Sequence, residues 1–335
     1  MPSSTSHSDR QVPLLALLLL GLGAVVLGLE VLYTVRWNPE IRFFCEAYQI
    51  KTHQARRLEQ GAGPKTVISG GSSSLFSIDT GRLQSVSGIP SVNMAFAAGM
   101  GASVLTQAAL QELRPGDTLV VALEPMLLTD SLEPPAMGVQ FGWATGNTAW
   151  FFHPQVGGQT LSWPSALLAL RPGGYHIVTM IGKWVRGGPI YRYRIEDMHP
   201  DGFTQTEVRV PDPQPGWHVG RLSPESHLFL KSLAQWCREH QVQVYYLLPW
   251  SYGPPEVIES FRRLNAQFLV EISQYIPTLR DPRLGAYEDK AHFADSGFHL
   301  TPEGAVVRTD VLAELLKNRR VWSPDELRVL AQVRP

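Results

Sequence analysis

Cysteine is scarce in this chain, and neither sign of charge dominates. Cys45 and Cys237 are the two cysteines among 335 residues, too few for a disulfide scaffold or a cysteine-based zinc site. The sequence leaves two alternatives for them, one disulfide or two unpaired buried thiols. The 29 basic and 30 acidic residues give a net charge of −1. We therefore expect no nucleic-acid partner, because such a partner requires a basic surface for its phosphates.

Short motifs for metals and nucleotides are also missing. The chain has no H-x₃-H or C-x₂-C spacing, no Walker A motif and no complete G-x-G-x-x-G. We therefore expect neither a metal site nor an organic cofactor. The composition, 44% hydrophobic and 18% charged, excludes a disordered chain.

A long apolar run begins near the N-terminus. Val12–Tyr33 contains 22 residues with a single charge, Glu30, and a helix of that length would reach about 33 Å, enough to cross a bilayer. A cleaved signal peptide and a buried core helix are the alternatives. No small-x-small cleavage site follows the run. We predict an uncleaved anchor: residues 1–36 form a tail and a transmembrane helix, and residues 12–33 contact the lipid bilayer.

The charges beside the anchor do not fix its orientation. Arg10 precedes the run, whereas Arg36, Arg42 and Lys51 follow it. The positive-inside rule would place the C-terminal side in the cytoplasm, although a large domain behind a single anchor often crosses regardless of charge. We expect a single-pass protein of the cell membrane with an extracytoplasmic domain, mainly because of a family resemblance described below.

Strand and helix patterns divide the rest of the chain into three parts. Residues 37–64 are expected to form a helical stalk. Residues 65–125 and 222–320 alternate apolar strands with helices, which is typical of an α/β domain with a parallel sheet. Residues 126–221, rich in Gly, Pro and Trp, are expected to form an insertion with few helices. The predicted strands are 65–69, 91–96, 118–124, 242–248 and 276–279, and the predicted helices are 102–113, 224–240, 254–275 and 302–317.

Polar residues follow the predicted strands, where open parallel sheets bind their ligands. Gly70–Ser74 follow the first strand, and Asn93 lies in the second. Glu124 ends the third strand, and Asp295 and His299 precede the last helix. A serine, a histidine and a carboxylate on one rim are the groups used for acyl transfer.

Two of these segments resemble sequence blocks of the SGNH/GDSL hydrolase superfamily. Ile68–Ser72 is similar to the first block, with Ser72 at the nucleophile and Gly71 where the usual acid stands. Val92–Ala95 is similar to the second block, with Ala95 at the usual oxyanion-hole glycine.

The final block of the superfamily has its counterpart near the last helix. Asp295 and His299, followed by Leu300-Thr301, resemble the block that carries the catalytic acid and base, with a spacing of four residues where three is usual. The resemblance covers most of 65–125 and 222–317. It is closest to membrane-anchored, extracytoplasmic members such as the alginate O-acetyltransferase-like group.

The resemblance implies a doubly wound parallel sheet in three layers and a serine esterase or O-acyltransferase. Ser72 would attack the acyl carbonyl, His299 would carry the proton and Asp295 would orient the imidazole. The backbone N–H groups of Ser72 and Ala95 would hold the oxyanion. The substrate would be an acylated cell-envelope glycan or a small acyl donor, with a membrane-bound polysaccharide-modification partner. The candidate substrate-binding residues are Asn93 and Trp250.

Glu124 is a departure from the family pattern. The third block normally supplies an Asn at this position, and a carboxylate donates to an oxyanion only when it is protonated. Loss of one oxyanion donor typically lowers the rate by about 10²–10³. This motivates an alternative of a different class, a catalytically inactive scaffold or binding subunit of a polysaccharide assembly.

The insertion concentrates aromatic residues, namely Trp143, Trp150, Trp163, Trp184 and Trp217. These rings would stack on sugars if exposed, or form a small core of the insertion. Tyr191–Arg194 alternates like a strand, with Arg192 and Arg194 on one face that would bind an anionic polymer or be a solvated surface. We expect the insertion to overhang the rim that carries Ser72.

Overall fold

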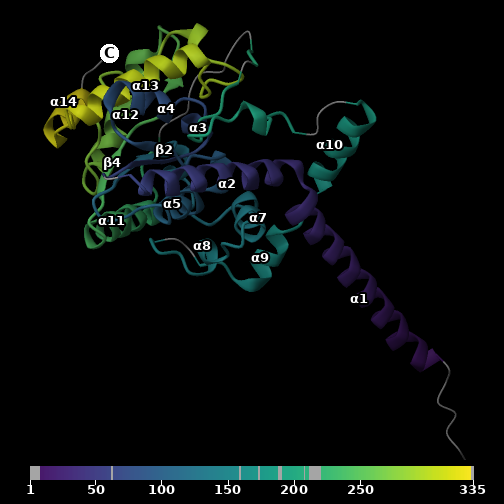
Figure 1. Ribbon diagram of the computed structural model, residues 1–335. Coiled ribbons are helices and arrows are strands. Elements are labelled where there is room, and N and C mark those ends of the chain that lie inside the picture. The colour runs from purple at the N-terminus through teal and green to yellow at the C-terminus, as the bar shows by residue number, and fades with distance from the viewer. Residues whose placement is uncertain are drawn as a thin grey trace, which may run out of the picture.

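The computed structural model describes residues 8–61, 63–157, 160–172, 174–187, 191–206, 208–210 and 220–332. Trp217 lies outside the described residues. Four parallel strands form the central sheet in the order β2-β1-β3-β4 (Figure 1). They are β1 (Thr66–Gly70), β2 (Ser91–Asn93), β3 (Thr118–Ala122) and β4 (Gln243–Tyr246). The predicted mixed α/β class with a parallel sheet is confirmed.

Helices cover both faces of this sheet. On β3, Leu119 and Val121 belong to one apolar cluster, with residues of α5 (Ala102–Leu110) and α11 (Pro224–Glu239). Val120 and Ala122 belong to another, with residues of α4 (Thr80–Ser87) and α13 (Pro302–Lys317). Because alternate side chains of a strand point to opposite faces, the continuous apolar run of β3 is buried on both sides.

The segment expected to be a stalk is a helix of the core. In α2 (Pro39–Glu59), Asn38 caps the helix by accepting a hydrogen bond from the Glu40 N–H, and the first turn carries Pro39. Phe44 and Ala47 are buried in the same cluster as Val67 of β1. The stalk prediction was therefore wrong, because α2 packs an apolar face on the α/β domain instead of standing apart from it.

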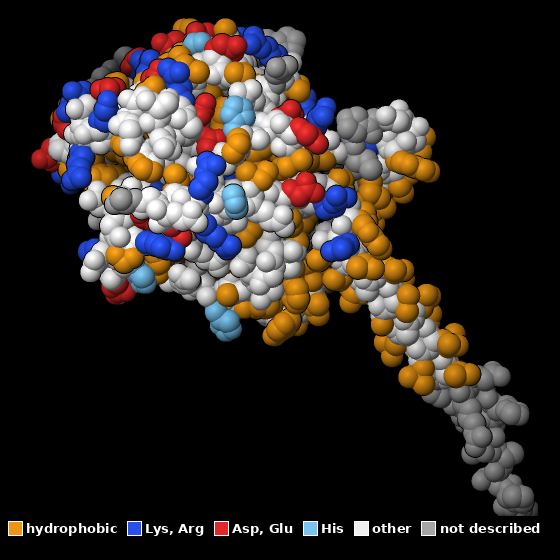
Figure 2. Space-filling model, in the orientation of Figure 1, with side chains coloured by type: hydrophobic (Ala, Val, Ile, Leu, Met, Phe, Trp, Pro, Cys, Tyr) orange, Lys and Arg blue, Asp and Glu red, His pale blue; other side chains and the backbone are white. Residues whose placement is uncertain are grey.

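The N-terminal apolar run forms α1 (Ser8–Leu32), followed by the short π-helical turn Tyr33–Trp37. Leu14–Trp37 is long and apolar enough to cross a membrane. This helix projects from the domain (Figure 1), and hydrophobic side chains line it from Leu14 onward (Figure 2). Because none of its most apolar window is buried inside the protein, the buried-core alternative does not fit.

The insertion contains more helix than its composition suggests. It includes α6 (Met126–Thr129), α7 (Ala136–Ala144), α8 (Ala149–Phe152), α9 (Trp163–Ala169) and α10 (Gly174–Val185). The expectation of few helices was wrong because prolines begin some of these helices instead of preventing them. Pro164 lies in the first turn of α9, where a missing N–H costs nothing, and the Ser162 hydroxyl caps the same turn.

The C-terminal part differs from the predictions in detail. Residues 276–279 make isolated bridges instead of a strand, one from Thr278 to Tyr246 and one from Leu279 to Val321. The additional elements are β5 (Ser251–Tyr252), β6 (Ala286–Tyr287), α12 (Ile258–Ile272) and α14 (Pro324–Gln332), which packs on α12.

The two cysteines are free thiols. Cys237 is buried and Cys45 is half-buried. Burial raises the pKa of Cys45 to about 11 and that of Cys237 to about 12. Of the two alternatives, the structure therefore has unpaired thiols and no disulfide between these residues.

Candidate active site

The three serines after β1 lie in three different environments. They form the single turn α3 (Ser72–Leu75), which begins where β1 ends. Ser74 is buried, and its hydroxyl donates to the Ala122 carbonyl at 2.9 Å. Ser73 is also buried and donates to Glu124 at 2.7 Å. Ser72 is half-buried, and within the described part of the chain its hydroxyl makes no hydrogen bond. Ser72 is therefore the serine of this turn whose hydroxyl is available to a substrate.

Glu124 lies beneath this turn. Its Oε1 accepts from both the N–H and the hydroxyl of Ser73, at 3.0 and 2.7 Å. Its Oε2 is buried and has no hydrogen-bond partner among the described residues. Burial raises the pKa of Glu124, against the opposing effect of the hydrogen bonds from Ser73. The protonated carboxyl is thus favoured more than for an exposed glutamate.

The glycine before the turn is required by this carboxyl group. A Cβ atom at Gly71 would lie 2.1 Å from Oε2 and 2.3 Å from Oε1 of Glu124. No side chain fits at position 71 unless Glu124 moves. The acid that the resemblance places at position 71 is missing, and the carboxyl group of Glu124 occupies the adjacent space.

Asp295 and His299 form a close pair in the loop before α13. Nδ1 of His299 lies 2.8 Å from Oδ1 of Asp295. The loop closes through a hydrogen bond from the Ala294 N–H to the His299 carbonyl at 2.8 Å, and the Ser296 hydroxyl accepts from the His299 N–H at 3.2 Å. A four-residue spacing is therefore compatible with an Asp–His pair.

Two residues of the insertion complete the surroundings of Asp295. The Tyr193 hydroxyl donates to Oδ2 of Asp295 at 2.8 Å, and Nη1 of Arg192 lies 2.9 Å from the same oxygen. Burial opposes ionisation of Asp295, but the hydrogen bonds from His299 and Tyr193 outweigh it, and the pKa of Asp295 is lowered. Sequence reasoning missed Tyr193, and the alternating pattern of 191–194 was its only signal. Arg194 does not join Arg192 at the site, because it pairs with Glu196 at 3.3 Å.

The ring of His299 packs on Phe76, the residue that follows α3. The two ring centroids lie 4.5 Å apart, and the Phe76 N–H donates to the Ser72 carbonyl at 3.1 Å. No hydrogen bond joins Ser72 to His299 in the described residues, and the catalytic roles of the three residues stay predictions.

The second-block residues have structural partners. The Asn93 amide donates to the carbonyls of Ser74 and Ile78, at 3.0 and 2.8 Å, and its Oδ1 accepts from the Ala95 N–H at 2.9 Å. Both Asn93 and Ala95 are fully buried. Asn93 as a substrate-binding residue and Ala95 as an oxyanion donor therefore do not fit this geometry, because their polar groups are already used within the protein.

Trp250 is likewise a core residue and not part of a binding surface. Its ring is buried, and its Nε1 donates to Asp281 at 2.6 Å. The guanidinium groups of Arg283 and Arg308 lie over the ring, 4.7 and 4.8 Å from its centroid. Its candidate role in substrate binding is therefore corrected.

The described insertion tryptophans differ in exposure, and Trp143 is half-buried, with its ring centroid 6.1 Å from that of Trp163. Trp150 is buried, with its ring centroid 5.5 Å from that of Phe141. Trp163 and Trp184 are exposed, and they lie on α9 and α10. The core explanation holds for Trp150, and the exposed pair remains available to a partner.

Comparisons with known proteins give no family assignment. No protein-family model, curated protein or solved structure matches the chain. Within the described residues, no group of three or more His, Cys, Asp and Glu side chains is placed to hold a metal ion.

Proposed function

We propose that this protein is a membrane-anchored serine esterase or O-acyltransferase with an SGNH-like, doubly wound fold. The observation that carries the proposal is the Asp295–His299 pair, whose imidazole packs on Phe76 directly after α3, together with the half-buried Ser72, whose hydroxyl makes no hydrogen bond among the described residues. The proposed substrates are acyl groups of a cell-envelope or exported polysaccharide, or a small acyl donor. A membrane-bound polysaccharide-modification protein would be its partner.

The proposed reaction uses the neutral imidazole of His299 with its proton on Nδ1. With Nδ1–H donated to Asp295, Nε2 is left to accept the proton of the Ser72 hydroxyl as its oxygen attacks the acyl carbon. The imidazolium then donates this proton to the leaving alcohol. Water would complete hydrolysis of the acyl-enzyme, and a sugar hydroxyl would complete acyl transfer. A longer Ser–His distance without substrate is compatible with this chemistry, because catalytic hydrogen bonds tighten in the substrate complex.

The oxyanion would form near the start of α3. The Ser72 N–H has no acceptor among the described residues, so it is available as one donor. The second donor proposed is the Glu124 carboxyl group in its protonated form, since its pKa is raised and its Oε2 makes no hydrogen bond with the described residues.

The alternative function is an inactive scaffold or binding subunit of a polysaccharide assembly. The specific observation in its favour is that the Ala95 N–H is donated to Asn93, while Glu124 replaces the usual amide donor. An ionised Glu124 would repel an oxyanion, and the site would then bind an ester without cleaving it.

Turnover of p-nitrophenyl acetate by the membrane-reconstituted chain tests the proposal. We expect Ser72→Ala and His299→Ala each to remove most activity and the double variant to be little worse, because triad members act as a unit. Ser85→Ala, an exposed serine of α4, is the matched control and should leave the rate unchanged. Equal rates for the wild type and Ser72→Ala would contradict an enzymatic role, and binding of an acetylated glycan without turnover would support the scaffold.

The proposed location is the cell membrane, with the domain outside the cytoplasm. The chain should stay with membranes after a carbonate wash, whereas release of a product lacking α1 would show a cleaved signal. A C-terminal reporter that is active only outside the cytoplasm should be active, and a silent reporter on a full-length chain would overturn the orientation.

A further inference from the structure

Two helices of the insertion expose an unusual amount of apolar surface. On α9, Trp163, Leu167 and Leu168 are exposed, with Leu168 at 65%. On α10, the exposed large apolar residues are Val178, Ile181, Trp184 and Val185. The positions 178, 181 and 185 lie on one face of a helix. Contiguous exposed apolar surface of this kind marks a site of interaction rather than an ordinary solvated face.

Both helices adjoin the end of α1. They lie on either side of the point where α1 meets the domain, and hydrophobic side chains continue from α1 onto this surface (Figures 1 and 2). The Tyr33 hydroxyl lies 3.3 Å from Nε2 of His176 and 2.6 Å from Sδ of Met180, which fixes α10 to the end of the apolar run. Arg171, just after α9, pairs with Glu30 at 2.8 Å.

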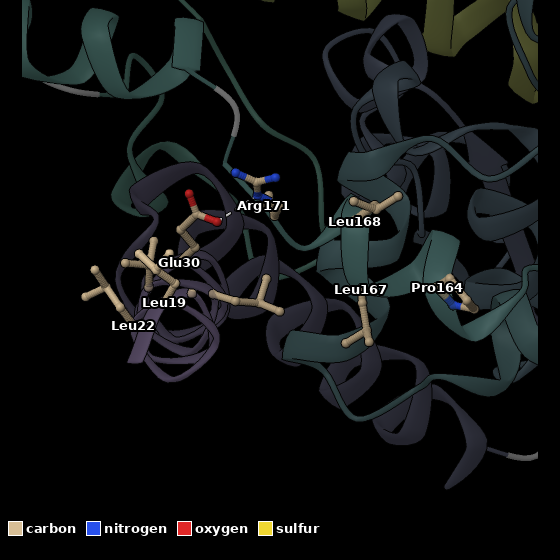
Figure 3. Close-up of a pocket in the computed structure, with 10 residues that line it drawn as sticks. Leu19, Leu22, Glu30, Pro164, Leu167, Leu168 and Arg171 are labelled. Atoms are coloured by element: carbon tan, nitrogen blue, oxygen red, sulfur yellow. Dashed lines mark hydrogen bonds and ion pairs between the residues drawn. The ribbon is translucent and has the colours of Figure 1, made fainter. Parts of the chain in front are cut away.

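A groove separates α9 from α1 (Figure 3). It has a volume of about 620 Å³, and Leu167 and Leu168 of α9 line it opposite Leu19 and Leu22 of α1. Glu30 and Arg171, which form an ion pair, also line the groove. A groove with apolar walls on both sides, one of them a candidate membrane-spanning helix, is suited to acyl chains and not to water.

We infer that α9 and α10 lie in the interfacial region of the bilayer that α1 crosses, with lipid acyl chains in the groove. The occupant is assigned as lipid because the exposed apolar face is continuous with the candidate membrane span. Trp37 after α1, Trp163 of α9 and Trp184 of α10 are exposed, and tryptophan is enriched at the membrane–water interface. Lys183 and Arg186 lie near Trp184 in sequence, as basic residues do in helices that rest on lipid headgroups.

Contact of α9 and α10 with the bilayer would fix the orientation of the domain relative to the membrane. The segment that follows α10 carries Arg192 and Tyr193, which contact Asp295. The interfacial helix and the candidate active site are thus joined by a few residues of chain. The inference concerns membrane contact alone and does not depend on whether the site is catalytic.

Single-cysteine labelling of the full chain in phosphatidylcholine vesicles tests the inference. Leu168→Cys and Val178→Cys would carry an environment-sensitive nitrobenzoxadiazole label, and Leu228→Cys on α11 is the control, because Leu228 is equally exposed and lies far from α1. Labelling of the wild-type chain, which has no introduced cysteine, gives the background signal from Cys45 and Cys237. We expect blue-shifted emission at 168 and 178 that spin-labelled lipids quench severalfold more than emission at 228.

Each other outcome overturns the inference. Labels at 168 and 178 that remain in water, with emission and quenching like those at 228, would show that α9 and α10 do not touch the bilayer. Blue-shifted labels that spin-labelled lipids do not quench would show that a protein partner or a second copy covers the surface. Release of the labelled chain from the vesicles by carbonate would show that α1 does not cross the bilayer, and α9 and α10 would then not lie in the interface beside it.

Discussion

The carboxyl group of Glu124 fills the space beside Gly71, so that a Cβ atom at position 71 would come within 2.1 Å of Oε2. Gly71 has φ −89° and ψ −160°, a backbone conformation that alanine also adopts. The glycine is therefore required by its neighbour and not by its backbone. Because Ser72 follows directly, any change in this contact also shifts the candidate nucleophile.

A double-mutant cycle should reveal this dependence. We expect Gly71→Ala to lower the free energy of unfolding by about 1–3 kcal/mol, the usual cost of overpacking. In a Glu124→Ala background the same substitution should cost much less, because the space is then open. Chemical denaturation of the four chains measures the coupling. Gly63→Ala is the control, since no atom lies within 4 Å of its Cβ position, and additive effects at 71 and 124 would contradict the proposed contact.

Glu124→Gln should change the pH dependence of stability. Burial raises the pKa of Glu124 above its ordinary value of 4.5 in the folded chain. Above pH 4.5 the unfolded state loses a proton that the folded state retains, so this residue lowers the stability of the wild type as pH rises toward the raised folded pKa. Glutamine keeps the acceptor for Ser73 and does not titrate.

The unfolding free energy of Glu124→Gln relative to the wild type should therefore increase from about pH 4.5 upward. Denaturation at a series of pH values measures this difference, and the exposed Glu256→Gln is the matched control. A difference that is constant with pH would show that the carboxyl group is ionised in the folded chain. The activity of the glutamine variant should also persist to higher pH if a neutral donor serves the oxyanion.

Lys51 should make the free energy of unfolding rise with pH, opposite to the effect of Glu124. Its ammonium group is fully buried and donates to the carbonyls of Asn93 and Gly202, both at 2.7 Å. Burial lowers the pKa of Lys51 to about 7, with partial compensation by the charge of Asp201. Between pH 7 and the unfolded value of 10.5, the unfolded state binds more protons, so stability should rise with pH by up to about 1.4 kcal/mol per unit.

Lys51→Met should remove this rise, although it leaves two carbonyls without a donor and lowers stability overall. Urea denaturation from pH 7 to 9 measures both effects. Lys231→Met, on the exposed side of α11, is the control for loss of one lysine. Parallel pH profiles of the wild type and Lys51→Met would contradict the lowered pKa.

Elements that are determined by residues close together in the sequence could be predicted from the sequence. The run at 119–122 is apolar throughout, and it forms the buried part of strand β3. Helix α13 begins at Pro302 as predicted, because Thr301 caps it and Pro302 suits the first turn. The Asp295–His299 pair lay within one loop and was also accessible to sequence reasoning, although its catalytic role is untested.

Contacts between distant segments were not predictable in the same way. Asn93 and Ala95 resemble a catalytic block, yet their hydrogen bonds to each other and to α3 depend on how β2 docks beside β1. The role of Gly71 depends on the register of β1 with β3, which brings Glu124 beneath the turn. The pattern of residues 37–64 predicts a helix but does not show what its apolar face contacts, so the packing of α2 on the domain was not predictable from it.

Tyr193 should act as a positioning residue for the Asp295–His299 pair. Its hydroxyl donates to Oδ2 of Asp295 at 2.8 Å, while His299 binds Oδ1 at 2.8 Å, so Tyr193→Phe removes one of the two donors to Oδ2. A positioned base contributes about 10²–10⁴ to a rate, and we expect the variant to lower kcat about tenfold with little change in KM. Arg192→Gln should act in the same direction, because Arg192 binds the same oxygen.

Arg194→Gln is the matched control. Arg194 pairs with Glu196 in solvent, and its loss should leave kcat unchanged. Steady-state kinetics on p-nitrophenyl acetate separates kcat from KM, and a rise in KM alone after Tyr193→Phe would mean that Tyr193 contacts substrate instead of orienting the pair.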